Sequence, residues 1–135
     1  MFNLSIVTPE KIFYEGEVTS IIIPGSEGYL GVLSDHAPLM TAIIPGKMTI
    51  KDKSDQEIFL SVSFGFFEVS SNHATLLADS IEYISEIDIE RTKAALERAQ
   101  KRLADAGSGN IDITRAQRAL ERAQNRIKIY LSAEK

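Results

Sequence analysis

The sequence has no cysteine, and this absence removes several classes of chemistry at once. Disulfide frameworks, thiolate zinc sites and cysteine nucleophiles are all excluded, and a reducing compartment suits such a chain. No apolar run approaches the length of about 18 residues that a membrane span needs, and the opening MFNLSIVTPEK lacks a basic segment followed by an apolar one. We therefore expect a soluble chain that does not span a membrane.

Residues that could form an active site are also scarce. Ser34, Asp35 and His36 are adjacent, whereas the members of a hydrolytic triad must converge from separate elements. His73 lies in a polar stretch with no second histidine near it, so no metal-ligand spacing appears. The glycine-rich segment 25–31 lacks the Lys-Ser or Lys-Thr of a phosphate loop. We expect no catalytic residue and no metal site, and a hydrolase using Ser34 or His36 is a rival interpretation that an activity assay would decide.

Charge is distributed unevenly along the 135 residues, whose formal net charge is -4. Residues 1–84 carry 11 acidic and 4 basic side chains, a net charge of -7, whereas residues 85–135 carry 8 acidic and 11 basic ones, a net charge of +3. Arginine is absent from the first part, and its planar fork suits carboxylate or phosphate partners. All seven arginines lie in the second part: Arg91, Arg98, Arg102, Arg115, Arg118, Arg122 and Arg126.

Residues 1–84 have the pattern of an antiparallel β-sandwich. Short runs rich in Ile, Val, Phe and Thr recur every eight to twelve residues between turn-forming residues. No connection is long enough for a crossover helix, which argues against a parallel sheet. Tight turns are expected at Pro24–Gly25 and Pro45–Gly46, and a polar hairpin tip at 52–55. The predicted strands are 2–7, 17–23, 29–32, 39–44, 47–51, 57–62, 66–69, 74–78 and 81–83.

Residues 85–135 have the pattern of two helices. Ser85 is the expected cap of a helix that begins near Glu86, with Asp88 three residues after the cap. Its stripe of apolar or small residues ends at the glycine-rich stretch 107–110. Comparison of 87–102 with 111–126 gives 11 identities in 16 positions, so the second helix copies the first. The two stripes are Ile89, Thr92, Leu96, Ala99, Leu103 and Ala106, and then Ile113, Ala116, Leu120, Ala123, Ile127 and Tyr130.

A short loop between two such helices predicts an antiparallel hairpin. Every second position of each stripe is small, so only Ile113, Leu120 and Ile127 offer large anchors on the second helix, a gross gain of roughly 1.5 to 3 kcal/mol each on burial. This marginal docking suggests a hairpin that opens at 107–110 and rebinds elsewhere.

The arginines have two possible roles at this point. They can pair with Asp88, Glu97 and Glu121 along a solvated helix face. The excess of basic over acidic groups favours instead an external acidic partner. An arginine-rich module that binds nucleic acid or an acidic protein is the alternative, although the chain is acidic overall and no aromatic stacking residues interleave the basic ones.

The chain also resembles a known family over its whole length. The motifs are VTPEK, the stretch VTSIIIPGSEGYLGVLSDHAPLMTAI (18–43), FGFFEV, LLADS (76–80) and the Arg/Ala-rich tail, in that order. They are similar to the epsilon subunit of bacterial rotary (F-type) ATP synthases. The resemblance implies a ten-stranded sandwich (1–84) held by the gamma subunit against the c-ring, and a regulatory hairpin (85–135). It also implies a non-catalytic rotor subunit at the cytoplasmic face of the membrane, whose hairpin inhibits ATP hydrolysis at the alpha/beta hexamer.

The same resemblance implies two sets of site residues and no required cofactor. Some members bind regulatory ATP through I/L-D-x-x-R-A, and here the motif continues from Arg91 to Thr92, where the family has Ala. The nucleotide set is Glu82, Ile87, Asp88, Arg91, Arg122 and Arg126. The partner-binding set is Ser26, Glu27, Tyr29, Leu30, His36, Arg98, Arg102, Arg115 and Arg118.

Overall fold

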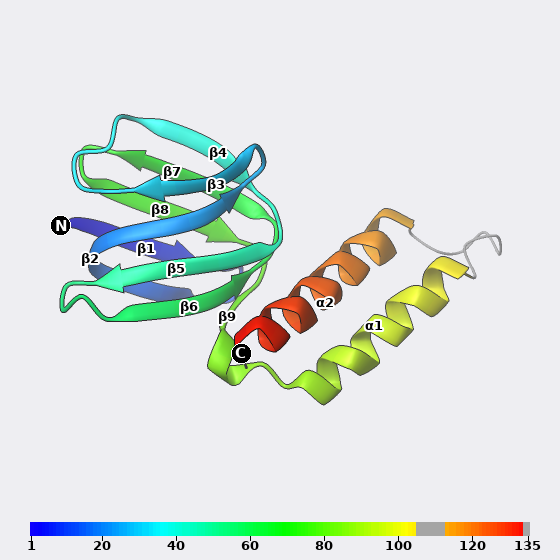
Figure 1. The fold of residues 1–135 in the computed structure, drawn as a ribbon. Helices are drawn as coiled ribbons and strands as arrows, with labels where there is room; N and C mark the ends of the chain where they lie inside the picture. Colours follow the sequence, from blue (N-terminus) through cyan, green and yellow to red (C-terminus); the bar gives the residue numbers. More distant parts are fainter. Residues whose placement is uncertain (105–112, 134–135) are drawn as a thin grey trace. The chain divides into compact units, whose positions relative to one another are not determined.

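The computed structural model describes residues 1–104 and 113–133, which form two compact units (Figure 1). Met1–Tyr83 is called the sandwich unit here, and Ile84–Lys135 the helical unit. The predicted helix stop at 107–110 lies outside the described residues.

The sandwich unit contains nine strands, close to the positions predicted from hydrophobic alternation. The main difference is β2, which begins five residues earlier than predicted. The strands are β1 (Phe2–Val7), β2 (Ile12–Gly25), β3 (Gly28–Val32), β4 (Leu39–Ile43), β5 (Gly46–Asp52), β6 (Glu57–Val62), β7 (Gly65–Ser70), β8 (His73–Ala78) and β9 (Ile81–Tyr83).

The strands are hydrogen-bonded in the order β1-β8-β7-β4-β2-β5-β6-β9, with β3 on β2, and they face each other as two layers (Figure 1). The long strand β2 takes part in both layers. Its first half pairs with β1 and its second half with β5 and β3, and the register shifts between Val18 and Ser20. The resemblance implied ten strands, and counting the two halves of β2 separately gives that number. The predicted fold class, a sandwich followed by two helices, is confirmed.

One strand pair departs from the antiparallel expectation. β1 and β8 are parallel, with Leu4 opposite Ala74 and Ile6 opposite Leu76. Parallel neighbours need a long connection, and here the intervening strands β2–β7 supply it in place of a crossover helix. The lack of a connection long enough for a crossover helix was therefore not sufficient to exclude a parallel strand pair.

The core of the sandwich unit follows from the two-residue period of its strands. Leu4, Ile6, Met48, Leu60 and Phe67 are among the side chains with no exposed surface. Each such side chain contributes roughly 1.5 to 3 kcal/mol of gross transfer free energy. Since all members of this core lie between Phe2 and Tyr83, the sandwich unit has the core of an independently folding domain.

Two turns refine the sequence prediction. The tight turn assigned to Pro24 and Gly25 forms instead at Ser26 and Glu27, because both earlier residues are the buried last residues of β2. Gly28 follows with a φ of 126°, a conformation that favours glycine. The predicted hairpin tip does form at Asp52, whose side-chain oxygen accepts hydrogen bonds from the backbone N–H groups of Ser54 and Gln56.

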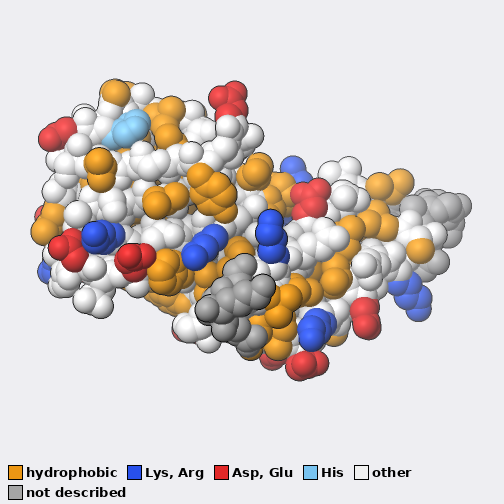
Figure 2. All heavy atoms as spheres, viewed as in Figure 1, with side chains coloured by type: hydrophobic (Ala, Val, Ile, Leu, Met, Phe, Trp, Pro, Cys, Tyr) orange, Lys and Arg blue, Asp and Glu red, His pale blue; other side chains and the backbone are white. Residues whose placement is uncertain are grey.

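The helical unit contains a 3₁₀ turn, η1 (Ile84–Glu86), and the antiparallel helices α1 (Ile89–Ala104) and α2 (Ile113–Ala133) (Figure 1). Hydrophobic side chains follow the seam between the helices (Figure 2). The fully buried positions on this stripe are small: Thr92, Ala99, Ala116 and Ala123.

The predicted large anchors of the second helix are only partly correct. Ile113 is 55% exposed, whereas Leu120 and Ile127 are half-buried. The buried large residue of α2 is Ile129, which packs with Ile84 and Ile87. Ile129 was missed because it lies off the stripe copied from the first helix.

Candidate functional site: an apolar sheet surface and a basic hairpin

An exposed row of apolar side chains crosses the outer face of one layer of the sandwich. Strand registers place Ala42 beside Phe66, Phe66 beside Leu77, Leu77 beside Val7, and Val7 beside Ile12. Phe66, Leu77 and Ile12 are 59%, 52% and 62% exposed. Five neighbouring strands at about 4.8 Å spacing make this apolar row roughly 19 Å long. Contiguous exposed apolar surface of this kind is typical of a protein-binding face.

The next rows on the same face carry carboxylates among polar residues, with the exposed Met40 beside Glu68 at the β4 end. Glu68 lies beside Thr75, Thr75 beside Ser5, and Ser5 beside Glu15. Glu17 lies one row further, beside Asn3. An apolar row bordered by carboxylates is complementary to a partner surface with an apolar ridge and basic flanks. The alternation of side chains on either side of buried Phe67 could have shown from the sequence that Phe66 and Glu68 are exposed. It could not have shown which strands share this face.

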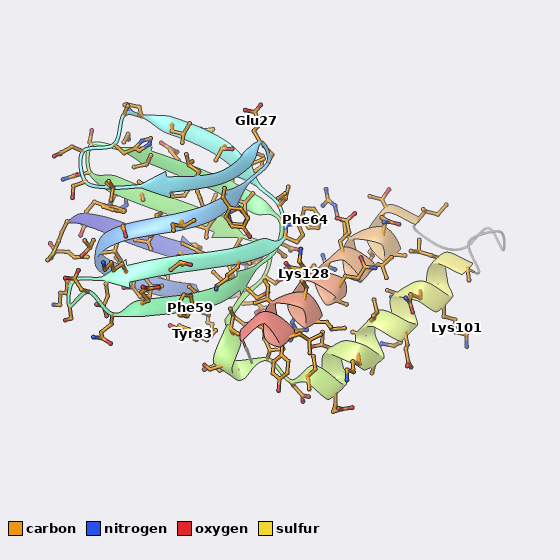
Figure 3. All side chains as sticks on the ribbon, viewed as in Figure 1. Glu27, Phe59, Phe64, Tyr83, Lys101 and Lys128 are labelled. Carbon is orange, nitrogen blue, oxygen red and sulfur yellow. The ribbon has the colours of Figure 1, made fainter. Side chains whose placement is uncertain are left out.

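The partner-binding residues predicted in the sandwich unit do not form one cluster. Ser26 and Glu27 form the β2–β3 turn, and Glu27 points away from the sandwich (Figure 3). Tyr29 and Leu30 follow on β3, and the hydroxyl of Tyr29 accepts a hydrogen bond from the backbone N–H of Lys47 at 3.2 Å. His36 lies beyond the other end of β3, a strand of five residues that spans roughly 13 Å between its end Cα atoms. The predicted set therefore divides between opposite ends of the sandwich.

His36 is half-buried in the loop of residues 33–38, called the β3–β4 loop here. Its Nδ1 lies 2.7 Å from the carbonyl oxygen of Ala37. The backbone N–H of Asp35 in the same loop donates to the side chain of Asn72, 2.6 Å away in the β7–β8 turn. No prediction from the sequence included Asn72.

Tyr14 is the titratable group of the sandwich unit whose pKa is clearly shifted by its surroundings. Burial raises the pKa of its phenol above 10.0, and the charges of Asp52 and Tyr83 raise the pKa further. Its ring belongs with the core residues rather than with either predicted site.

In the helical unit, Asp88 caps α1. Its side-chain Oδ1 accepts a hydrogen bond from the backbone N–H of Arg91 at 3.1 Å, and its carbonyl accepts from the N–H and hydroxyl of Thr92. The predicted cap, Ser85, lies instead in the 3₁₀ turn, where it cannot serve the first turn of α1. Both residues can cap, so only the point where the chain enters the helix decides between them.

Thr92, the departure from the ATP motif, has no exposed surface, and its hydroxyl donates to the carbonyl of Asp88 at 2.8 Å. The threonine hydroxyl is therefore used inside the helical unit, and it does not occupy the exposed side of α1 where Arg91 lies. The change from Ala to Thr leaves that exposed side unaltered.

The nucleotide set is only partly brought together. Ile87 packs with Ile129, and Arg122 and Arg126 lie seven and three residues before Ile129 on the same side of α2. Both arginines are half-buried and engaged in interactions within the described chain. Arg91 is exposed at the start of α1, whereas Glu82 lies on β9 of the sandwich unit.

The remaining arginines form exposed rows along the helices. Arg98 and Arg102 lie four residues apart on α1, and Arg115 and Arg118 lie three apart on α2, so each pair shares one helix face. Figure 3 shows Lys101 extending away from α1. Four exposed guanidinium groups on two helices suit an acidic protein surface.

No helix among 1–104 and 113–133 has the length and apolar character of a membrane span. Across the same residues, no three Asp, Glu or His side chains are grouped as a metal site would require.

Comparison with known proteins accounts for both units. The family model for the β-sandwich domain of the ATP synthase delta/epsilon chain matches residues 1–84, and the model for its long α-helix domain matches 85–130. The chain belongs to the ATP synthase delta/epsilon family. The resemblance seen in its sequence motifs is thereby confirmed.

Curated members of the delta/epsilon family support the same assignment. The ATP synthase epsilon chain of Protochlamydia amoebophila is 45% identical over 103 residues, which cover 76% of this chain and 70% of that one. The epsilon chain of Moorella thermoacetica is 43% identical over 107 residues, covering 79% and 80%.

Solved structures show the same fold. A chain in the Euglena gracilis mitochondrial ATP synthase matches with a TM-score of 0.70 at 22% identity, covering 97% of this chain and 79% of that chain. A chain of the Tetrahymena thermophila mitochondrial ATP synthase matches with a TM-score of 0.64 at 13% identity, covering 98% and 96%. The delta/epsilon fold is thus shared at low sequence identity.

Proposed function

We propose that this chain is a non-catalytic central-stalk (rotor) subunit of a proton-translocating ATP synthase, peripheral to the cytoplasmic face of the membrane. Residues 1–84 would anchor it to the gamma subunit and the c-ring. Residues 85–135 would form a regulatory hairpin that inhibits ATP hydrolysis by binding the alpha/beta hexamer. Membership of the delta/epsilon family supports the stalk role, and the features of each unit support the finer assignments.

The observation that carries the regulatory role is the composition of the seam between α1 and α2. Its fully buried stripe positions are Ala99, Ala116, Ala123 and Thr92, none of which has a large apolar side chain. Separating the helices would therefore uncover no large side chain that is fully buried on the stripes, and half-buried Leu120 and Ile127 would lose only part of their cover, at about 25 cal/mol per Å². In an opened hairpin, the guanidinium groups of the exposed arginines could bind an acidic protein surface.

The observation that supports the anchoring role is the apolar row with its acidic border. We propose that this face receives the gamma subunit through an apolar ridge with basic flanks. Because Ser26, Glu27, Tyr29 and Leu30 lie at the opposite end of β3 from His36, we propose that these two ends contact different neighbours in the stalk and ring.

The proposed gamma-binding face can be tested by charge reversal. Glu68→Lys places a cation in the acidic border, and it is expected to weaken binding to gamma without unfolding the sandwich unit, because Glu68 is exposed. Glu57→Lys on β6 is the matched control, since Glu57 is also exposed and lies outside the row. Equal binding by the two variants would contradict the assignment of the face.

We further propose that ATP binds the closed helical unit at Arg91, Arg122 and Arg126 and acts as a regulatory ligand. A ligand specific for the closed form adds about 2.7 kcal/mol of stabilisation at 100 times its dissociation constant, which is enough to bias a weak seam. Asp88 would contribute by holding the first turn of α1, since its side chain already accepts the N–H of Arg91.

Calorimetry with ATP tests this site. Arg126→Ala should weaken or abolish the binding heat, whereas Arg102→Ala should retain it. Arg102 is the matched control because it holds the equivalent position in the first copy of the repeat and is exposed on α1. The absence of heat with the wild-type chain would end the nucleotide proposal and leave the stalk role untouched.

A further inference from the structure

Asn72 joins three segments of the sandwich unit that are far apart in the sequence. Its Oδ1 accepts a hydrogen bond from the backbone N–H of Asp35 at 2.6 Å, and its Nδ2 donates to the carbonyl of Met1 at 3.4 Å. Its own carbonyl accepts from the backbone N–H of Asn3 at 3.1 Å. The β7–β8 turn, the start of β1 and the β3–β4 loop are thus held together at one end of the sandwich (Figure 1).

Two properties of asparagine are used at this position. The backbone has a φ of 61°, in the left-handed region that asparagine tolerates better than most residues. Its side chain supplies both an acceptor and a donor, which glycine lacks entirely and an ionised aspartate supplies only in part. The neighbouring Ser71 shares the unusual backbone, with a φ of 49°, but makes no comparable side-chain bonds among the described residues.

The β3–β4 loop has little other support. Leu33 is 65% exposed, Ser34 and Asp35 are exposed, and Asp35 has a φ of 61°. Within the described chain, the bond between Asp35 N–H and Asn72 Oδ1 is the hydrogen bond that ties residues 33–38 to a distant segment. The conformation in which the loop presents His36 therefore depends on Asn72.

We propose that Asn72 is a positioning residue that holds the β3–β4 loop in the shape required for docking on the stalk. The proposal rests on the function proposed above, in which His36 faces a neighbouring subunit. Asn72 contacts the loop through the backbone N–H of Asp35, so its effect on docking is indirect.

The first test measures the loop alone, by amide hydrogen exchange at Asp35 in the full chain. Asn72→Gly keeps the backbone conformation and removes both side-chain bonds, so Asp35 exchange should become about two- to tenfold faster, as expected for loss of one hydrogen bond. Asn72→Asp keeps the acceptor for the Asp35 N–H, so the Asp35 amide should exchange at the wild-type rate in this variant. Ser71→Gly is the matched control and should also leave Asp35 unchanged. Unchanged exchange in Asn72→Gly, or equal acceleration in Asn72→Asp, would overturn the positioning role.

The second test measures docking, by binding of each full-length variant to ATP synthase from which this subunit has been removed. We expect about two- to tenfold weaker binding for Asn72→Gly and wild-type binding for Asn72→Asp and Ser71→Gly. Faster Asp35 exchange with unchanged binding would overturn the link to docking. If the wild-type chain itself fails to bind, the proposed function fails, whereas the exchange result still decides whether Asn72 holds the loop.

Discussion

Replacement of Asp88 separates its role as a helix cap from any role as a ligand. Asp88→Ala removes the acceptor that lies 3.1 Å from the backbone nitrogen of Arg91, and it also removes a negative charge from the N-terminus of α1. Loss of an N-cap side chain costs about 1 kcal/mol, and loss of a favourable charge near a helix N-terminus costs roughly 0.3 to 1 kcal/mol. The total expected loss is therefore about 1 to 2 kcal/mol of helical-unit stability.

Two conservative variants separate the contributions of the cap and the charge. Asp88→Asn retains the acceptor and loses only the charge, because asparagine is an equally good cap. Glu90→Gln removes a charge from the same helix turn without touching the cap. Both should lose only about 0.3 to 1 kcal/mol.

The assay is urea unfolding of the full chain followed by circular dichroism at 222 nm, where the helices dominate the signal. The midpoint of the helical transition should fall furthest for Asp88→Ala. If Asp88→Ala and Glu90→Gln unfold at the same urea concentration, the cap contributes nothing and the reasoning is refuted.

Three further predictions concern stability. Gly65→Ala should lower the free energy of unfolding by roughly 1 to 3 kcal/mol or more, because a Cβ there would collide with the backbone of Leu77 on the neighbouring strand. Gly31→Ala is the control, since a Cβ at Gly31 meets nothing within 4 Å, and it should be nearly neutral in denaturant titrations. Thr92→Ala should lower the urea midpoint of the helical transition, with a loss of roughly 1 kcal/mol, because it removes a buried methyl group and a hydroxyl bonded to Asp88; an unchanged midpoint would contradict its packing. The folded chain holds the pKa of Tyr14 above 10.0, so as pH rises the unfolded chain loses the phenol proton before the folded chain does. The free energy of unfolding should therefore fall as pH rises above about 10, and Tyr14→Phe should reduce the slope of that fall.

The positions of the strands and helices were largely predictable, because hydrophobic periodicity is a local property of the sequence. Buried Leu4, Ile6 and Phe67 follow the two-residue period, and Ala99 and Ala123 follow the helical stripe. Register and pairing are not local. The parallel pairing of β1 with β8, and the two halves of β2, depend on segments about 70 and 30 residues apart that no short pattern connects.

The same distinction explains the candidate sites. The uneven charge and the helical repeat indicated a basic hairpin, since both can be read directly from the sequence. The apolar row required the registers of five strands, and the separation of Ser26 from His36 required the direction of β3. Asn72 was missed because a turn asparagine is common, and only the fold brings Asp35 and Met1 to it. Ile129 was missed because it breaks the copied stripe.

The regulatory role of the hairpin is tested most directly by measuring ATP hydrolysis by the catalytic hexamer with gamma. The full-length chain would be compared with a chain that ends at Ser85, which retains the complete core of the sandwich unit. We predict that both bind gamma and that only the full-length chain slows hydrolysis. Equal hydrolysis rates at equal binding would contradict the inhibitory role of the hairpin.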